Sequence, residues 1–185
     1  MNLMIDFETM GNTTDTIVVS LGACLFNNEG IHKKGLWYYD LYEQQIAGRT
    51  WTASTLAWWM KQSDAARAVF HDNKRERLPM EKFFVEFEKW LDEGLEEHLE
   101  GRDELKVWGN GADFDVAILK DLYLTMGGGE QAVPWKFWNG CCFRMFNRMT
   151  KIKEKMKMKG AAHNALDDAI YQAECVMAVM NKKVK

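Results

Sequence analysis

Two acidic residues near the start of the chain are its strongest chemical signal. Asp6 and Glu8 lie within residues 2–9 (NLMIDFET), whose other members are mainly apolar and typical of a buried strand. Alternate side chains of a strand share a face and are about 7 Å apart, so both carboxylates project the same way while Ile5 and Phe7 face the other. Burying two like charges together is costly unless a cation neutralises them, and oxygen donors favour a hard divalent metal. Taken alone, the pair also fits a strand with one solvated face.

Two further acidic segments lie far along the chain, at residues 108–115 (WGNGADFD) and 163–168 (HNALDD). Four carboxylates from three segments can together hold two divalent ions about 3.5–4 Å apart. A neutral imidazole such as that of His163 can accept a proton from water near neutral pH, although a lone histidine ahead of a helix is more often a loop residue. The other three histidines lie in polar settings and are predicted to have no catalytic role.

The order and spacing of these three segments resemble the three motifs of the DEDDh branch of the 3′-5′ exonuclease superfamily. That pattern has an acid pair on the first strand, a stretch ending in Phe-Asp, and a His followed five positions later by Asp. A closer likeness is to exonucleases of the bacteriophage exonuclease A and mycobacterial exoribonuclease type. It is carried by the Trp-Gly-Asn-Gly form of the second motif and by residues 58–63 (WWMKQS) and 134–139 (PWKFWN), and it spans residues 2 to about 181.

The resemblance implies a metal-dependent 3′-5′ exonuclease that hydrolyses single-stranded RNA or DNA from the 3′ end to nucleoside 5′-monophosphates. It implies that Asp6 bridges two divalent ions, that Glu8 and Asp168 complete the first ion, and that Asp115 serves the second, partly through water. His163 is then the base that activates the attacking water. Oxygen ligands with several retained waters favour Mg²⁺, and Mn²⁺ should substitute.

Two of these acids have acidic neighbours that could take their place. Asp113 could cap the helix that follows it, and Asp167 lies beside Asp168 in the first turns of the last helix, where the helix dipole favours negative charge. Helical periodicity does not choose between the members of either pair. The Phe-Asp register of the motif selects Asp115, and the five-residue step from His163 selects Asp168.

The chain has eight tryptophans, and aromatic faces can stack on unpaired bases for roughly 1–3 kcal/mol each. Most tryptophans are large core residues, which is the expectation for Trp90 and Trp108. Trp58 and Trp59 are adjacent on a predicted helix, so only one can face fully inward. Trp59 and Gln62 are three positions apart and share a helical face, and we expect that face to hold the terminal nucleotide.

The resemblance also places the terminal sugar and base against Thr9 and Met10, directly after the acid pair. Between Arg144 and Lys159 lie seven basic residues and the single acid Glu154, although the whole chain has a net charge of −3. This run is predicted to form a basic flap at 144–160 that guides phosphates without reading sequence, with Arg144 as a substrate contact. The alternative is a solvated or mobile arm. The acidic remainder of the chain favours a strand end threaded into a pocket over a long bound duplex.

The elements that position these residues are predicted to form one α/β domain over residues 1–185, which is 47% hydrophobic. Strands are expected at 2–8, 16–26, 34–42 and 106–108, with an extended piece at 136–138. Helices are expected at 53–70, 80–98, 143–149 and 164–181, and directly after residue 114. The first three strands are close enough in sequence for an antiparallel meander. Together these elements predict a mixed central sheet flanked by helices, and the resemblance makes this the ribonuclease H-like fold.

Composition excludes several other classes of protein. No apolar run approaches the length of a membrane span and no secretory signal precedes the first strand, so a cytoplasmic enzyme with no membrane partner is expected. The four cysteines lack paired zinc spacing and are expected to be thiols. A structure-selective ribonuclease H-like endonuclease and a catalytically silent nucleic-acid-binding module are the alternatives. The His-to-Asp spacing argues against the endonuclease, and the intact acids argue against the silent module. The choice between RNA and DNA and the formation of a homodimer stay open at this point.

Overall fold

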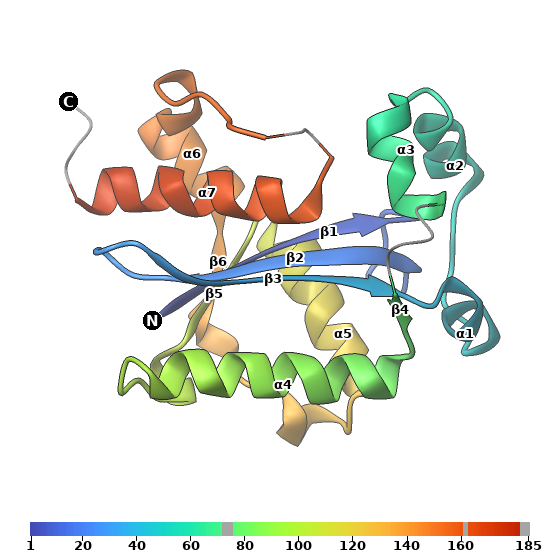
Figure 1. Ribbon diagram of the computed structural model, residues 1–185, viewed down its shortest axis with the longest axis horizontal. Helices are drawn as coiled ribbons and strands as arrows, with labels where there is room; N and C mark the ends of the chain where they lie inside the picture. Colours follow the sequence, from blue (N-terminus) through green and yellow to red (C-terminus); the bar gives the residue numbers. More distant parts are fainter. Residues whose placement is uncertain (72–75, 161–162, 182–185) are drawn as a thin grey trace.

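A six-stranded mixed sheet forms the centre of the protein, in the order β4-β3-β2-β1-β5-β6 (Figure 1). The computed structural model describes residues 1–71, 76–160 and 163–181. The expected antiparallel meander is confirmed and consists of β1 (Asn2–Thr9), β2 (Val18–Phe26) and β3 (Ile31–Tyr39). Three parallel pairings complete the sheet, and they add β5 (Lys106–Gly109) to β1, β6 (Gly140–Cys142) to β5 and β4 (Arg77–Leu78) to β3.

Helices cover both faces of this sheet. One face carries α7 (Ala165–Met180) and α6 (Phe143–Thr150), and the opposite face carries α4 (Met80–Glu96) and α5 (Ala117–Met126) (Figure 1). The mixed sheet with helices on both faces is the predicted ribonuclease H-like arrangement. Because helices cover both faces of the sheet, every residue of the central strands β1 and β2 is buried, including the acids Asp6 and Glu8.

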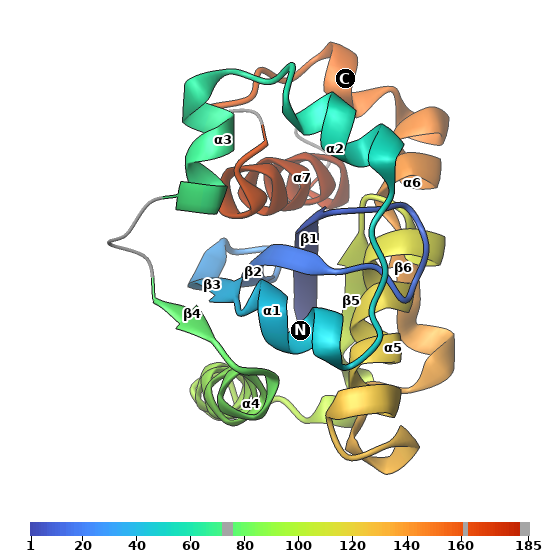
Figure 2. The same ribbon diagram turned by 90° about the vertical axis from the view of Figure 1, so that its right-hand side faces the viewer.

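Three short helices gather at the end of the sheet where β1 finishes (Figure 2). They are α1 (Leu41–Ile46), α2 (Ala53–Trp59) and α3 (Asp64–His71). The start of α7 lies near the same end (Figure 1). Motifs that are far apart in the sequence are therefore brought to one end of the sheet.

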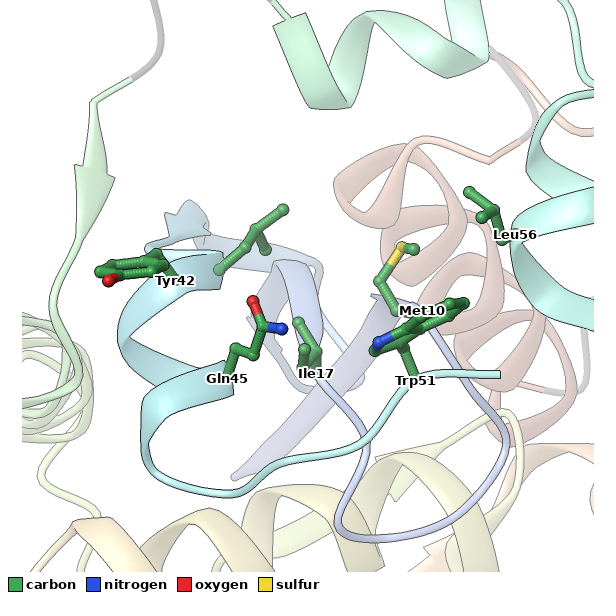
Figure 3. A pocket seen from close by; sticks show the side chains of 7 residues that line it. Met10, Ile17, Tyr42, Gln45, Trp51 and Leu56 are labelled. Carbon is green, nitrogen blue, oxygen red and sulfur yellow. The ribbon is translucent and has the colours of Figure 1, made fainter. Parts of the chain in front are cut away.

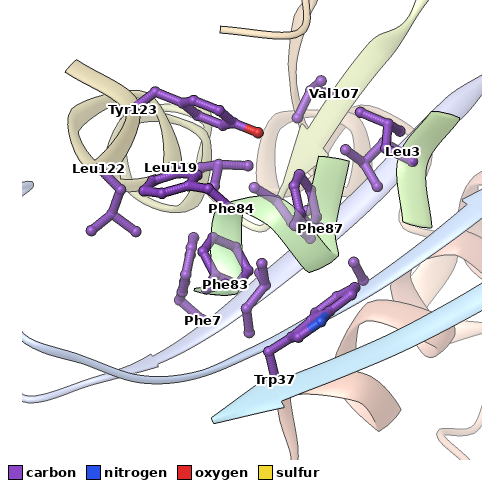
Figure 4. Close-up of a cluster of buried hydrophobic side chains, with 14 of the residues drawn as sticks. Leu3, Phe7, Trp37, Phe83, Phe84, Phe87, Val107, Leu119, Leu122 and Tyr123 are labelled. Carbon is purple, nitrogen blue, oxygen red and sulfur yellow. The ribbon is translucent and has the colours of Figure 1, made fainter. Parts of the chain in front are cut away.

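The alternation of β1 decides which way the first acid pair faces. Ile5 and Phe7 belong to the core beneath α4 and α5, where Figure 4 shows Phe7 close to the phenylalanines of α4. Met4 belongs to the separate core beneath α7 and α6. Asp6 and Glu8 follow Met4 at two-residue steps, so they share the α7 face, as the sequence predicts.

Two predicted elements have wrong boundaries because polar side chains cap the start of a helix there. The predicted helix at 53–70 is two helices, and α3 begins after Ser63, whose hydroxyl accepts a hydrogen bond from the Ala66 N–H. The predicted strand at 34–42 ends at Tyr39. Asp40 caps α1 there, because its carboxylate accepts hydrogen bonds from the N–H groups of Tyr42 and Glu43. Serine and aspartate side chains compete with a continuing helix or strand in this way.

The other elements lie close to their predicted ranges. The extended piece expected at 136–138 is a 3₁₀ turn at Phe137–Asn139 followed by β6. A π-turn at Ala112–Val116 precedes α5. Trp90 and Trp108 are half-buried against the two cores, and their indole N–H groups donate to the Lys34 carbonyl and to Asn2 Oδ1.

All four cysteines are unpaired, as expected. Within the described ranges, no helix is both long enough and apolar enough to cross a membrane.

Candidate active site

Three carboxylates from distant parts of the chain meet at the end of β1. Asp6, Glu8 and Asp168 each offer an oxygen, and these oxygens lie within 4.8 Å of one another. Asp6 and Glu8 are buried, and Asp168 is half-buried in the first turns of α7. The acids chosen from the spacing of the first and third motifs are therefore brought together.

A glycine lets α7 approach the sheet closely enough to complete this group. Gly22 on β2 pairs with Asp6 on β1, and a Cβ at Gly22 would lie 2.1 Å from the backbone of Ala165. No side chain fits in that space. The first turn of α7 is capped by Asn164, whose side-chain oxygen accepts hydrogen bonds from the N–H groups of Leu166 and Asp167. Close packing and the cap together fix Asp168 over the end of β1.

Asp115 lies beside this group but is not one of its three members. It is buried, with Oδ1 accepting from the Phe7 N–H at 3.2 Å and Oδ2 accepting from the Gly111 N–H at 3.1 Å. Gly109 leaves room for it, because a Cβ there would lie 2.6 Å from the Cβ of Asp115. Asp113 is exposed and makes no side-chain cap. Burial therefore favours Asp115 over Asp113.

All four acids have raised pKa values, and burial is the largest cause in each case. Repulsion from the neighbouring acids adds to burial and holds the pKa of Asp6 well above its ordinary range. The pKa of Glu8 rises from 4.5 to about 8, by burial and by repulsion from Asp168 and Asp115. Burial raises the pKa of Asp115 to about 6, against the opposing backbone hydrogen bonds. A divalent cation would offset both the cost of burying these carboxylates and the repulsion between them. The purely carboxylate donor set fits a hard ion.

Gln172 is a site residue that the sequence analysis missed. It is buried, and its Nε2 donates to Asp6 Oδ1 at 2.7 Å; this hydrogen bond lowers the pKa of Asp6, opposing burial and the repulsion from the neighbouring acids. Its Oε1 is buried and has no hydrogen-bond partner among the described residues. The available signal was its position four residues after Asp168, since residues at that spacing share one helical face.

His163 lies at the edge of the acid group. Its backbone N–H donates to Asp168 Oδ2 at 3.1 Å, and its φ of 63° is in the left-handed region, where histidine is enriched among non-glycine residues. The indole of Trp58 meets the imidazole edge to face, with ring centroids 5.0 Å apart. Trp58 is 41% exposed and was not predicted to be a site residue. It is the one of the two adjacent tryptophans that contacts a candidate catalytic side chain.

The predicted contact between Trp59 and the terminal nucleotide does not fit the structure. Trp59 is 2% exposed, packs against Phe70, and donates its indole N–H to the Thr9 carbonyl at 2.9 Å. It therefore supports the end of β1 through the Thr9 carbonyl and offers no exposed ring face to a base. Gln62 is half-buried and donates its amide to the Trp58 carbonyl within the same turn. A buried indole whose N–H finds a carbonyl is favoured over an exposed one, which is why Trp59 turns inward.

The remaining expected substrate contacts are Thr9, Met10 and Arg144. Thr9 is buried, and its hydroxyl donates to the Gly11 carbonyl. Met10 is half-buried and lines a surface cavity. Arg144 is exposed, and its guanidinium lies near the second motif, 3.7 Å from where a Cβ at Gly111 would be.

The basic segment at 144–160 is anchored to the protein body. Ile152 is fully buried, and the Met156 carbonyl accepts a hydrogen bond from the Tyr171 hydroxyl of α7. Lys153 Nζ lies 5.2 Å from the centre of the Phe143 ring, a cation–π distance. These contacts argue against the alternative of a loose arm. Residues 161–162, which join the segment to His163, lie outside the described residues.

The fold and these residues define a class of protein. An acid pair on the central strand, a buried Asp after the second motif, and a His five residues before the last Asp are arranged on a ribonuclease H-like sheet, which is the pattern of DEDDh 3′-5′ exonucleases. The profile of the family described as the 3′-5′ exoribonuclease Rv2179c-like domain matches residues 1–180, and the chain belongs to that family. The protein is therefore a 3′-5′ exonuclease, a hydrolase of a class that depends on divalent metal ions.

Solved structures of the same fold agree with this class. The nuclease domain of 3′hExo, a DEDDh family member bound to rAMP, is 12% identical with a TM-score of 0.59, over 98% of this chain and 92% of that one. Exonuclease I is 11% identical with a TM-score of 0.61, over all of this chain and 41% of that one. The cell-death related nuclease CRN-4 is 16% identical with a TM-score of 0.55, over 98% of this chain and 64% of that one. No curated protein sequence is a significant match.

Proposed function

We propose that this exonuclease hydrolyses single-stranded nucleic acid from the 3′ end with two divalent ions and releases nucleoside 5′-monophosphates. The observation that carries the proposal is the convergence of Asp6, Glu8 and Asp168 oxygens within 4.8 Å, with His163 tied to Asp168 by a backbone hydrogen bond. Asp6, Glu8 and Asp168 would hold one ion, and Asp6 and Asp115 would hold the second. Mg²⁺ suits this donor set best, and Mn²⁺ is expected to replace it.

Bound divalent ions would supply charge neutralisation, activation of the attacking water and stabilisation of the leaving oxygen. The protein groups orient the carboxylates that would hold these ions. Gln172 orients Asp6 through its 2.7 Å hydrogen bond, and two backbone N–H groups orient Asp115. Carboxylates held in this way lose little freedom when they bind a ligand, which favours a fixed geometry at the reacting phosphate.

His163 is the proton acceptor in this proposal. Its imidazole is confined by the edge-to-face contact with Trp58, while its backbone N–H is held by Asp168. A base at this position would take the proton of the water that attacks the last phosphodiester. The terminal sugar and base would then lie toward Thr9 and Met10, and Arg144 would contact a phosphate from the side of the second motif.

RNA is the favoured substrate, because the family is one of exoribonucleases. The structural neighbours do not decide between RNA and DNA, since 3′hExo is bound to rAMP and E. coli exonuclease I is in complex with a dT13 oligonucleotide. Residues 1–185 would act as one catalytic domain. Four unpaired cysteines support action in a reducing compartment such as the cytoplasm.

A time course on 5′-labelled RNA and DNA of identical sequence tests this function. With Mg²⁺ we expect a ladder that shortens one nucleotide at a time from the 3′ end, mononucleotide products, and no reaction in EDTA. A blunt duplex should react more slowly, because fraying the last pair costs a few kcal/mol before the end can enter the site. Internal cuts or release from the 5′ end would contradict the proposal.

A further inference from the structure

In the proposed function, only the terminal nucleotide of the strand enters the active site. Its base would lie toward Met10, which Figure 3 shows beside Trp51 in a cavity of about 360 Å³. Sites for small ligands have volumes of roughly 300–1,000 Å³, so this cavity has room for a nucleotide but not for a strand. The rest of the strand must therefore lie on the surface outside it, beyond the proposed phosphate contact at Arg144.

Two exposed aromatic side chains, here named the aromatic pair, directly precede the edge strand β6. Phe137 is 79% exposed and Trp138 is 65% exposed, and their rings meet edge to face with centroids 4.7 Å apart. Both belong to the segment 134–139 (PWKFWN), which has no role in the chemistry described above. Two adjacent large aromatic side chains that remain in water are typical of a binding surface.

The turn that carries the aromatic pair is fixed to the protein body. The side-chain amide of Asn139 donates to the Asp103 carbonyl at 2.9 Å, and Lys136 Nζ lies 3.0 Å from Asp103 Oδ1. Trp135, just before the turn, is buried and packs edge to face on Tyr123. Because this backbone is already ordered, a ligand that binds to the two rings loses little free energy in ordering it.

Strand β6 connects the aromatic pair to Arg144. It is the last strand of the sheet, and Figure 2 shows it with α6 along one side of the molecule. Its own side chains are small, since it consists of Gly140–Cys142. The Arg144 N–H donates to the Asn110 carbonyl at 2.9 Å, which holds Arg144 beside the second motif. Trp138 is six residues from Arg144, at most roughly 22 Å along an extended chain, and a few nucleotides can span that length.

The charge of this edge favours nucleic acid as its partner. Residues 131–153 include five basic residues and no acid, although the whole chain has a net charge of −3. Arg144, Arg148 and Lys151 are exposed among them. Basic side chains beside exposed aromatic rings suit a single strand, because the cations follow its phosphates and the rings stack on its bases. A second copy of this chain is disfavoured, because a symmetric contact through this edge would bring like charges together.

We propose that the aromatic pair is a stacking surface for unpaired bases of the substrate strand, on the 5′ side of the phosphate that Arg144 contacts. This inference rests on the proposed exonuclease function and deepens it, since it adds a binding surface that only longer strands reach. The aromatic pair accepts any unpaired base, because every base has an aromatic face.

A series of strand lengths tests this inference. RNA and DNA strands of two to roughly sixteen nucleotides, the upper size of a typical single-strand site, are given to the wild type and to the variants. The variants are Phe137→Ala/Trp138→Ala, which removes both rings, and Trp138→Phe, which keeps them. The matched control is Val85→Ala on α4, because Val85 is also 65% exposed. Thermal unfolding of each variant checks that the fold is intact.

The measured quantity is kcat/KM for removal of the first nucleotide. The ratio of the wild type to the double variant should be close to one for a dinucleotide, which cannot reach the aromatic pair. It should rise to roughly 5- to 150-fold for long strands, the effect of one stacked base. Trp138→Phe should lose less than the double variant, and Val85→Ala should match the wild type at every length.

Two outcomes would overturn parts of this account in distinguishable ways. If the wild type is active but the ratio to the double variant is the same at every strand length, the aromatic pair does not bind the strand and the exonuclease proposal stands. If the wild type shortens no strand from the 3′ end, the proposed function fails and the inference fails with it.

Discussion

At the scale of single residues, two neighbouring acids have different environments although they are two positions apart. Asp115 is buried and accepts two backbone hydrogen bonds, whereas Asp113 is exposed. Asp115→Asn should abolish turnover, and Asp113→Asn should retain the wild-type rate. Asn can accept only one of the two N–H groups well, a loss of about 1–3 kcal/mol that the removed buried charge offsets. Single-turnover assays with thermal unfolding check this. A dead Asp113→Asn beside an active Asp115→Asn would reverse the assignment.

His163 carries the second prediction at this scale. His163→Ala removes the proton acceptor but none of the carboxylates, so metal binding should remain while the rate falls on the order of 10²- to 10⁴-fold. Part of the rate should return at higher pH, where hydroxide is more abundant. Calorimetric titration with Mg²⁺ and a pH–rate profile measure the two effects separately. An unchanged rate at neutral pH would remove His163 from the mechanism.

At the scale of elements, the lysines of the basic segment 144–160 differ in what they contact. Lys153 lies over two aromatic rings, so it has a packing role. Lys157 and Lys159 are exposed and remain candidates for phosphate contact. Replacing both with Gln should weaken strand binding and reduce the slope of log affinity against log salt by roughly 0.7 for each lost contact.

The control for this prediction is Lys89→Gln on α4, on the opposite face of the sheet, where the side chain is 75% exposed. Equal salt slopes for the wild type, the double variant and the control would show that the segment is a packed surface element without a role in binding phosphate.

At the scale of the whole molecule, the acid group couples stability to pH and to metal. The pKa of Glu8 is raised from 4.5 to about 8 in the folded state, so its contribution to stability is fully present below pH 4.5 and is lost as the pH rises toward 8. In EDTA, Glu8→Gln should therefore become increasingly more stable than the wild type as the pH rises from 4.5 to 8. Excess Mg²⁺ should stabilise the wild type more at the upper end, because ligands must be deprotonated to bind.

Thermal unfolding from pH 4.5 to 8, in EDTA and in Mg²⁺, measures both effects, with the exposed Glu29→Gln as the control. If the difference in stability between Glu8→Gln and the wild type does not change with pH, burial does not raise the pKa of Glu8 as described.

The sequence by itself determined the class of fold, the acids and their faces. Alternation along residues 2–9 is a local property, so it correctly predicted that Asp6 and Glu8 share a face opposite to Phe7. The predicted meander is confirmed for the same reason, because short connections favour pairing of neighbouring strands. The motif spacing selected Asp115 and Asp168 where helical periodicity could not. The burial of Asp115 and the position of Asp168 beside Asp6 and Glu8 agree with that choice.

Only the tertiary structure decided which side chains surround those acids. Two adjacent tryptophans have equal local propensity, and it is the carbonyl of Thr9, brought close by folding, that turns Trp59 inward and leaves Trp58 against His163. The contact of Gln172 with Asp6 likewise depends on how closely α7 packs on Gly22, a distance set by long-range packing. Contacts between residues 166 positions apart are the product of chain topology and close packing, which local pattern does not encode.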